Sequence, residues 1–506
     1  MVSTRSYTFE PVLGLVLGAA LAGCGGNGTT TESASASASS SGSATDPGTT
    51  TPTTGTPTTS VSATGSSTDP SGTVSDSLGS SSGDPSSTGT PGTSTGSTGP
   101  ITATTTDASS SGTTTGGTTT DGTTTDTGLP CNFGDTMGMG DVEKSYLWVA
   151  NSDQNSVSKV DTQKVVEIAR YRMGPSVNDY GEDPSRTAVS LDGRFMVVNG
   201  RASGRTTMIA ANLEDCVDTN NNGKIDTSQN KDDLRAWGSD ECVRWSITHP
   251  FDGQQTGGPR GVTWTPGTLD EQKCVFTEPK IWVGYLAQFG TAHMARLDGL
   301  TGALEETVII NAWNVGDTSW GPYGAALDKK LDVWFTGLRG ELFRINTSQD
   351  PATFDRWNPP PATQSYGMTV DPDGDPWMAG CGGPVTTFDP VTQTFTPIAG
   401  TDACYRGIAA DKDGSVWVAE NGICGVTQID HKTNTLIKFH PLNPCSTPVG
   451  VSVDTEGFVW VVDEYIGAWK IDPKNVPAMK LINIANDHYT YSDMTGGQLK
   501  SVILPQ

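Results

Sequence analysis

Arginine and tyrosine residues occupy equivalent places in six short, similar stretches of this sequence. Guanidinium groups and phenol rings can hold a carboxylated or sugar-like ligand through charge-assisted hydrogen bonds and stacking. The stretches, with the residue at the shared place, are S-R-T-A (Arg186), P-R-G-V (Arg260), P-Y-G-A (Tyr323), S-Y-G-M (Tyr366), Y-R-G-I (Arg406) and P-V-G-V (Val449). We predict that the arginines and tyrosines bind a ligand, provided that a repeated fold brings the stretches to one face. In the alternative interpretation, each arginine neutralises neighbouring acids such as Asp463 and Glu464.

A second group of residues has the chemistry for acid–base catalysis. Carboxylates can bind Mg²⁺, and a histidine beside them can abstract a proton. The candidates lie near the C-terminus and are Glu420, His440, Asp463, Glu464 and His488. Most histidines and glutamates on protein surfaces have neither role, so this set is an alternative to the ligand-binding set.

An aromatic residue within a short strand rich in valine and isoleucine recurs along the chain. These anchors are Trp148, Phe195, Trp282, Trp334, Trp377, Trp417 and Trp460. Most follow a turn such as Asp413-Gly414 and precede a second strand that ends in a pair such as Ile429-Asp430. A repeat of about 40–45 residues with four strands is typical of a β-propeller. We therefore predict an all-β, seven-bladed β-propeller over residues 131–506, with the six stretches at the mouth of its central channel.

The first repeat lacks an opening strand, whereas an extra strand pattern follows the last repeat at residues 491–494. A propeller is stable when no sheet edge is left open to solvent, so the two ends of the repeat region must meet. We predict that residues 491–494 supply the missing inner strand and close the ring.

An insertion at about residues 213–243 carries the sequence D-T-N-N-N-G-K-I-D from Asp218 to Asp226. It resembles an EF-hand or dockerin-type calcium loop, in which alternate residues point inward and glycine allows a sharp turn. The ligands implied are the side chains of Asp218, Asn220, Asn222 and Asp226 and the carbonyl of Lys224. We expect a structural Ca²⁺ ion there, although the twelfth loop position is Gln229 and not glutamate. The alternative is a metal-free turn rich in asparagine and aspartate.

Eight of the nine cysteines lie in the region predicted to fold, and an even number in an exported protein favours four disulfides. Their positions relative to the repeats suggest pairs that join neighbouring loops. The predicted pairs are Cys381–Cys404, Cys424–Cys445, Cys216–Cys242 around the insertion and, by elimination, Cys131–Cys274.

The N-terminal region is that of a secreted and anchored protein. Residues 1–23 have a short apolar run that ends in Leu21-Ala22-Gly23 before Cys24, as in a bacterial lipoprotein signal whose cysteine is lipidated. Gly25 follows the cysteine, which favours the outer membrane, with the protein facing the periplasm or the cell surface. Residues 24–130 are rich in Ser, Thr, Gly and Pro and are expected to form a disordered tether.

The chain is strongly acidic, with a formal net charge of −25. Nucleic acids and anionic lipid surfaces attract basic proteins, so neither is an expected partner of the folded part. The expected partners are the membrane that holds the lipid anchor and, at the channel mouth, an unknown small molecule, glycan or protein.

Three segments resemble blades of the streptogramin (virginiamycin B) lyase-like and NHL-type propellers. They are "GSVWVAENG", "LDVWFTGLRGELFRIN" and "TPVGVSVDTEGFVWVVDE". The resemblance covers roughly residues 145–506 and implies a seven-bladed fold. It also implies an enzyme that opens a cyclic depsipeptide lactone by elimination, with a histidine base and Mg²⁺ held by acids. In those lyases W-F-T-E is closely followed by histidine, whereas here Gly337 follows Thr336 and Asn421 follows Glu420.

The function that we predict from the sequence is binding of a ligand or partner at the channel mouth, without turnover. The long tether favours display of a binding domain. One alternative is a lyase that uses Glu420, His440 and the acids Asp463 and Glu464. Another is a structural envelope component that needs no defined pocket.

Overall fold

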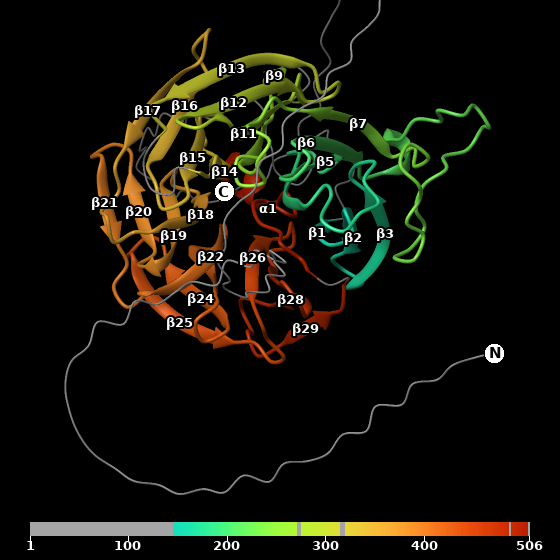
Figure 1. Cartoon of the computed structure of the whole chain (residues 1–506). Helices are drawn as coiled ribbons and strands as arrows, with labels where there is room; N and C mark the ends of the chain where they lie inside the picture. The colour runs from blue at the N-terminus through green and yellow to red at the C-terminus, as the bar shows by residue number, and fades with distance from the viewer. Residues whose placement is uncertain (1–144, 271–274, 314–318, 485–486, 504–506) are drawn as a thin grey trace, which may run out of the picture. The chain divides into compact units, whose positions relative to one another are not determined.

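The computed structural model describes residues 145–503, apart from 271–274, 314–318 and 485–486 (Figure 1). The predicted signal peptide, Cys24, the tether and both members of the Cys131–Cys274 pair lie outside the described residues. Within them, no helix is long and apolar enough to span a membrane.

Antiparallel sheets are arranged around a common centre in Figure 1, each running from an inner strand to an outer one. The first sheet has three strands, β1 (Tyr146–Asn151), β2 (Ser156–Asp161) and β3 (Val166–Arg172). The next two contain β4 (Pro184–Val189), β5 (Phe195–Gly200), β6 (Arg205–Ala210) and β7 (Val243–Thr248), then β8 (Val262–Thr265), β11 (Lys280–Gln288), β12 (Thr291–Asp298) and β13 (Leu304–Asn311). A separate hairpin joins β9 (Thr268–Asp270) to β10 (Val275–Thr277).

The remaining strands repeat the same up-and-down order. They are β14 (Pro322–Leu327), β15 (Val333–Gly337), β16 (Leu342–Asn346) and β17 (Thr353–Trp357); β18 (Ser365–Val370), β19 (Pro376–Gly383), β20 (Thr386–Asp389) and β21 (Thr394–Pro397); β22 (Ala403–Ala410), β23 (Ser415–Glu420), β24 (Gly425–Asp430) and β25 (Thr435–Pro441); and β26 (Pro448–Val453), β27 (Val459–Asp463), β28 (Gly467–Ile471) and β29 (Met479–Ile482). Pairing of Cys381 with Cys404 joins β19 to β22 in one larger sheet.

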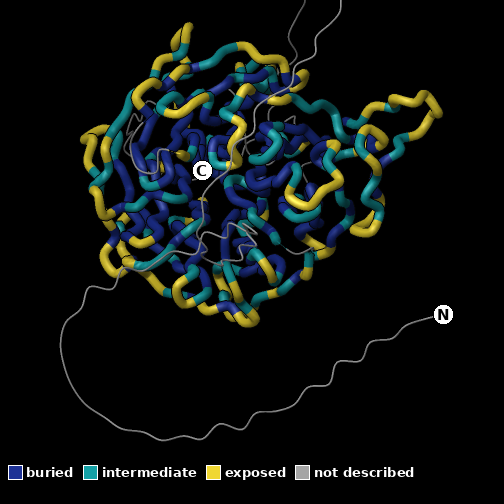
Figure 2. Tube along the Cα trace, in the orientation of Figure 1, coloured by how far each residue is buried: buried dark blue, intermediate teal, exposed yellow. Residues whose placement is uncertain are grey.

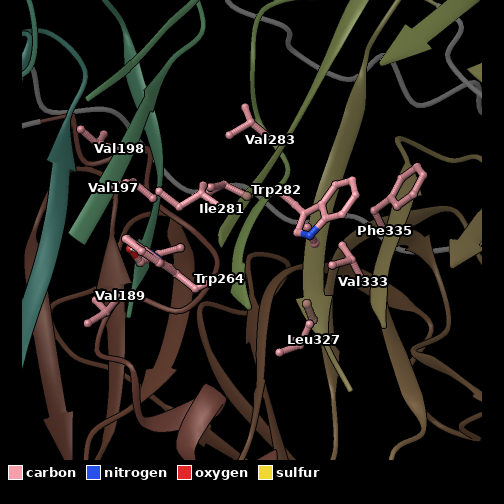
Figure 3. Packing of buried hydrophobic residues seen from close by; sticks show 14 of the residues in the cluster. Val189, Val197, Val198, Trp264, Ile281, Trp282, Val283, Leu327, Val333 and Phe335 are labelled. Atoms are coloured by element: carbon pink, nitrogen blue, oxygen red, sulfur yellow. The ribbon is translucent and has the colours of Figure 1, made fainter. Parts of the chain in front are cut away.

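This arrangement confirms the predicted all-β propeller architecture. The count of seven blades stays a prediction. The aromatic anchors all lie in the second strand of a repeat, or in β1 of the shortened first sheet, and all are buried. Apolar side chains fill the space between neighbouring sheets and form one buried cluster, which includes Trp264, Trp282 and Leu327 in Figure 3. The burial pattern in Figure 2 follows the same division, since strands are buried and the connecting loops are exposed.

An aspartate at the end of the inner strand organises the turn before the anchor. Asp411 accepts backbone hydrogen bonds from Asp413 and Ser415 through Oδ1 (2.9 and 2.8 Å), and Trp417 Nε1 donates to its Oδ2 at 2.8 Å. Gly414 in the same turn has a φ of 106°, which favours glycine. The same Asp–Trp bond occurs at Asp328–Trp334, Asp371–Trp377 and Asp454–Trp460. One residue type therefore fixes both the turn and the anchor.

The C-terminal segment closes the ring, although not as a regular strand. The Trp148 backbone N–H donates to the Met494 carbonyl at 3.0 Å, and Tyr491 forms one parallel bridge with Arg186 in β4. The chain then forms α1 (Gly497–Ile503), a helix that the sequence reasoning missed. Asp493 caps its start by accepting from the Gly496 and Leu499 N–H groups at 2.8 and 2.9 Å. The helix lies near the centre of the ring in Figure 1, against β14, β22 and β26.

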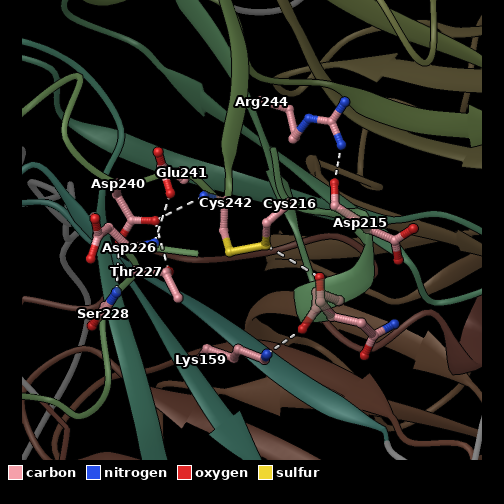
Figure 4. The surroundings of a disulfide bond; sticks show 12 residues. Lys159, Asp215, Cys216, Asp226, Thr227, Ser228, Asp240, Glu241, Cys242 and Arg244 are labelled. Atoms are coloured by element: carbon pink, nitrogen blue, oxygen red, sulfur yellow. Dashed lines mark hydrogen bonds between the residues drawn. A yellow bond between two sulfur atoms is a disulfide. The ribbon is translucent and has the colours of Figure 1, made fainter. Parts of the chain in front are cut away.

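The insertion between β6 and β7 packs against the outer strand of the first sheet. The Arg170 N–H in β3 donates to Ser228 Oγ at 2.9 Å. Cys216 and Cys242 form a disulfide at the base of the insertion, next to the carboxylates of Asp240 and Glu241 (Figure 4). The disulfides Cys381–Cys404 and Cys424–Cys445 are also present, so these three pairs are bonded as predicted.

Candidate functional site

The inner strands begin at one end of the ring, which we call the top face. Antiparallel pairing brings the ends of the second strands to the same face, so Arg201 after β5 and Glu464 after β27 lie there too. Of the five predicted ligand-binding residues, Arg186, Tyr323, Tyr366 and Arg406 lie near the starts of β4, β14, β18 and β22. Arg260 lies two residues before β8. The structure brings all five into one group of contacts.

Four tyrosine hydroxyls meet at the centre of this group. The Tyr323 hydroxyl lies 3.1 Å from that of Tyr366 and 2.9 Å from that of Tyr489. Tyr366 and Tyr489 also hydrogen-bond to each other, and Tyr491 donates to Tyr366 at 3.3 Å. Tyr323 and Tyr366 come from inner strands, whereas Tyr489 and Tyr491 come from the segment that closes the ring.

Four guanidinium groups lie against the aromatic rings of this group. Arg186 is 3.9 Å from the ring centre of Tyr491 and 4.7 Å from that of Tyr323, and Arg201 is 4.2 Å from that of Tyr489. Cation–π contacts of this kind stabilise a buried cation without neutralising it. Arg260 is 4.5 Å from the Trp320 ring, and Arg406 is 5.7 Å from the Tyr366 ring. We call Arg186, Arg201, Arg260, Arg406, Tyr323, Tyr366, Tyr489 and Tyr491 the tyrosine–arginine cluster.

Carboxylates balance only part of this positive charge. Arg201 pairs with Asp183 at 2.6 Å and Arg406 with Glu464 at 3.6 Å. Among the described residues, neither Arg186 nor Arg260 has an acidic side chain within ion-pair distance. Neutralisation of Glu464 is therefore observed for Arg406, as in the alternative interpretation. It does not extend to the other two predicted arginines.

Arg260 is fully buried and only partly hydrogen-bonded. Its Nη1 donates to the carbonyls of Gln255, Thr256 and Gly258 at 2.8 to 3.2 Å. Its Nε and Nη2 find no acceptor among the described residues. Burial lowers the pKa of Arg260 to about 10, so the side chain stays charged at neutral pH.

The charges of the cluster change the ionisation of its tyrosines. Burial raises the pKa of Tyr489, but the guanidiniums of Arg201, Arg186 and Arg406 have the larger combined effect and lower this pKa to about 8. Burial and the neighbouring phenol groups instead raise the pKa of Tyr366 and of Tyr491 well above the usual value. Tyr489 is thus the phenol on which negative charge would collect.

The cluster has two layers. Arg186, Arg260, Tyr323 and Tyr491 are buried behind it, with at most 2% of each residue exposed. Arg201, Tyr366, Arg406 and Tyr489 are partly exposed and form its outer layer. Three of the five predicted contact residues therefore lie where they set the electrostatic potential, and only Tyr366 and Arg406 lie where a ligand could touch them.

Sequence reasoning missed Arg201, Tyr489, Tyr491 and the stacking Trp320. Arg201 follows the second strand of its repeat, a position that the topology also places at the top face. The strand pattern predicts a closing strand only at residues 491–494, which overlaps the segment D-H-Y-T-Y-S-D at residues 487–493. Its alternating tyrosines could have indicated a face directed to the channel.

The acid–base candidates make side-chain contacts with different partners, and Glu464 pairs with Arg406. Glu420 accepts from Thr427 Oγ1 at 2.7 Å, and His440 contacts Gln428 at 3.3 Å. The Asp463 carboxylate accepts hydrogen bonds from the backbone N–H groups of four residues, Ser446, Thr447, Tyr465 and Ile466. His488 Nδ1 lies 2.9 Å from the carbonyl of Asp463.

These contacts are those of side chains that support loops. Within the described ranges, Cys424, Cys445 and Asp463 form the only group of three or more histidine, cysteine, aspartate or glutamate side chains whose ligand atoms all lie within 4.8 Å of one another, and the two cysteines are joined as a disulfide. The Mg²⁺ ion of the lyase alternative stays a prediction.

The predicted calcium loop has its oxygen-bearing side chains directed toward one another. Asn220 and Asn222 donate to Asp226 Oδ2 at 2.9 and 2.6 Å, and Asp218 accepts from the Asn222 and Gly223 N–H groups. Lys224 Nζ lies 2.9 Å from Asp226 Oδ1. The residues present fit a Ca²⁺ ion in type, because carboxylate and amide oxygens are its preferred ligands. Calcium binding there stays a prediction.

Comparison with known proteins gives similarity to solved structures, each at low sequence identity. No family model and no curated protein matches it. It is similar to a streptogramin B lyase structure, with 17% identity over 63% of this chain and 87% of the other, at a TM-score of 0.45. It is also similar to a functionally unknown protein from Desulfotomaculum acetoxidans, with 12% identity over 69% and 97% of the two chains, at a TM-score of 0.47. A catalytically inactive virginiamycin B lyase from Staphylococcus aureus, solved with quinupristin, has 16% identity over 64% and 94%, at a TM-score of 0.41.

Proposed function

We propose that this protein binds an anionic small ligand, carboxylated or sugar-like, at the top face of its propeller without turning it over. The observation that carries the proposal is the surplus of buried positive charge in the tyrosine–arginine cluster. Arg186 and Arg260 are 1% and 0% exposed, and neither has a carboxylate partner in the described chain.

Buried charges without partners are costly, so a cluster of them needs a physical reason. The three carbonyl bonds of Arg260 Nη1 satisfy only part of this side chain, because Nε and Nη2 make no hydrogen bond among the described residues. A positive potential directed at the channel mouth is such a reason, since it attracts an anion toward the outer layer. Arg201 and Arg406 supply guanidinium donors there, and Tyr366 and Tyr489 supply hydroxyls and ring faces.

We also propose that the binding domain is held at the outer membrane by lipidated Cys24 and the 24–130 tether, facing the periplasm or the cell surface. The support is the sequence of residues 1–130. Neither the lyase nor the structural alternative is favoured by a contact in the described part of the chain. In the structural reading, the cluster would bind no ligand.

Calorimetric titration of the full chain with glucuronate tests the proposal. We expect binding, with glucuronate recovered unchanged by mass spectrometry. Arg406→Gln should weaken binding about tenfold or more, because it removes an outer-layer cation. The matched control is Arg344→Gln on β16. Arg344 has the same side-chain exposure as Arg406, 23%, and likewise pairs with a carboxylate. It lies over the ring of Trp334, as Arg406 lies over that of Tyr366.

Equal binding by wild type and Arg406→Gln would place the ligand elsewhere. Absence of binding to any of the anions named here and in the following subsection would refute the proposal. Chemical change of the ligand would show that the site is catalytic.

A further inference from the structure

We infer that the group recognised at the tyrosine–arginine cluster is a doubly charged tetrahedral oxyanion, such as phosphate or a phosphate monoester. This inference rests on the proposed function, because it names the ligand class of the same site. It goes beyond a carboxylated ligand in both charge and shape.

The charge of the ligand follows from the balance of side chains. The cluster holds four guanidiniums, of which two face a carboxylate, Asp183 or Glu464. The nearby carboxylate of Glu182 faces another arginine, Arg205, at 3.5 Å, and Asp487 is bound by the Tyr180 hydroxyl. Two positive charges therefore remain, in a place where water screens them weakly. A dianion balances both, whereas a monocarboxylate leaves one.

The shape of the ligand follows from the direction of the donors. The hydroxyls of Tyr323, Tyr366 and Tyr489 meet at one point, and that of Tyr323 lies 2.9 Å from Tyr489 and 3.1 Å from Tyr366. The outer-layer groups come from different elements, namely the loop after β5, β18, β22 and the closing segment. Arg201 and Arg406 lie against the rings of Tyr489 and Tyr366, whose hydroxyls meet there. An oxyanion with several acceptor oxygens around one centre suits donors that converge from several sides. An extended dicarboxylate would place its second charge away from them.

A second feature of the cluster gives the inference a spectroscopic test. Burial raises the pKa of Tyr489, yet Arg201, Arg186 and Arg406 bring it down to about 8. The other groups that face this phenol are Tyr323, Tyr366 and Tyr491, with Glu464 and Asp183 behind the arginines. In the free protein, ionisation of Tyr489 to phenolate thus neutralises part of the excess positive charge of the arginines.

A bound dianion and the Tyr489 phenolate repel each other. Anion binding must therefore raise the pKa of Tyr489, and ionisation of Tyr489 must weaken anion binding by the same factor. The sign follows directly: affinity is highest when Tyr489 is protonated and falls as the pH rises through about 8. Sulfate stays doubly charged throughout this range, so any loss of its affinity reports on the protein.

The test is calorimetric titration of the full chain with sulfate, inorganic phosphate, a hexose phosphate and acetate, at constant ionic strength, near pH 7 and near pH 9. Near pH 7 we expect the affinity for sulfate and for phosphate to be at least about tenfold higher than that for acetate. Sulfate affinity should fall about tenfold by pH 9, and the loss should disappear in Tyr489→Phe. Comparison of phosphate with hexose phosphate shows whether a free ion or a phosphorylated sugar is preferred.

Tyrosinate absorbance provides a readout that needs no variant. Saturating sulfate should shift the phenolate transition near pH 8 upward in wild-type protein, and Tyr489→Phe should lack that transition. If Tyr489→Phe does not fold, the wild-type shift alone decides.

Equal binding of acetate and sulfate, with both weakened in Arg406→Gln, would overturn the dianion inference while leaving the proposed function intact. A phenolate transition that sulfate does not move would also overturn it. Failure of every anion, glucuronate included, to bind folded protein would overturn both.

Discussion

Buried charged side chains lie at both ends of the inner strands, but only those at one end are fully paired within the described protein. At the bottom end, Asp328, Asp371, Asp411 and Asp454 are buried, and both oxygens of each carboxylate accept hydrogen bonds from the turn and from a tryptophan. At the top end, Arg186 and Arg260 are equally buried, yet neither forms an ion pair with a carboxylate among the described residues. The aspartates follow β14, β18, β22 and β26, and the arginines lie near the starts of β4 and β8. All of these are inner strands of the same kind of repeat, so strand structure alone does not explain the difference.

The difference separates what the fold needs from what a ligand needs. Buried polar groups that serve folding are almost always satisfied within the protein, because an unsatisfied group costs stability. The bottom aspartates follow this rule in four repeats. The top arginines depart from it at one place, where the chain also brings four hydroxyls together. A site for an external anion is the simplest physical account of that departure.

The largest expected effect is on the satisfied end. Asp411→Ala removes two turn hydrogen bonds and the partner of Trp417 Nε1, all of them buried. We expect the free energy of unfolding in urea to fall by about 3 kcal/mol. The control is Asp413→Ala in the same turn, whose half-exposed carboxylate pairs only with Lys412 in the described structure and should matter by less than about 0.5 kcal/mol. Equal losses in the two variants would contradict the role given to Asp411.

The opposite outcome is expected at the unsatisfied end. Arg260→Met removes a buried cation with two unsatisfied nitrogens, but it also removes the bonds of Nη1 to three carbonyls. These effects offset each other, so we expect the free energy of unfolding to stay within about 1 kcal/mol of wild type. Sulfate affinity should nevertheless fall about tenfold, since the positive potential is reduced. The two measurements are urea unfolding without sulfate and calorimetric titration with it. A large loss of stability would show that Arg260 serves the fold, and the comparison of the two ends would fail.

The insertion offers an intermediate case. Asp226 is satisfied by Asn220, Asn222 and Lys224, yet the loop has oxygen ligands suited to Ca²⁺. Calcium at tenfold above its dissociation constant should stabilise the fold by about 1.4 kcal/mol, measured by thermal unfolding. Asp226→Asn should remove this gain, and Mg²⁺ at the same concentration should not reproduce it. No response to calcium in wild type would leave the loop as a metal-free turn.

The smallest expected effect concerns His431 at the bottom face. Its Nδ1 lies 3.2 Å from Asp371 Oδ2, and this hydrogen bond raises the pKa of His431. A raised pKa in the folded state stabilises the protein below the unfolded value of about 6.5, and the gain is lost as the pH rises through the folded value. The free energy of unfolding of wild type should therefore exceed that of His431→Gln by about 0.5 kcal/mol near pH 5.5. This difference should shrink near pH 8. A difference that grows with pH would contradict this assignment.

Periodic features of the sequence predicted the architecture well. The anchors, the turn glycines and three disulfides follow from local spacing, and each lies where expected in the described residues. Residues that act across the ring were harder to predict. Tyr489 and Arg201 are far apart in sequence, and their contact depends on how the ring closes. Burial of Arg186 and Arg260 could not be foreseen either, because arginine in a strand is usually solvated at its tip.

Closure of the ring and assembly of the site are one event. Residues 487–494 complete the first sheet beside Trp148 and also carry Tyr489 and Tyr491 into the cluster. In the sequence, residues 487–494 follow the strands of every sheet. A chain that stops before them keeps those strands but lacks Tyr489 and Tyr491. Under the proposed function, such a chain would lose anion binding even where most of the β-structure persists.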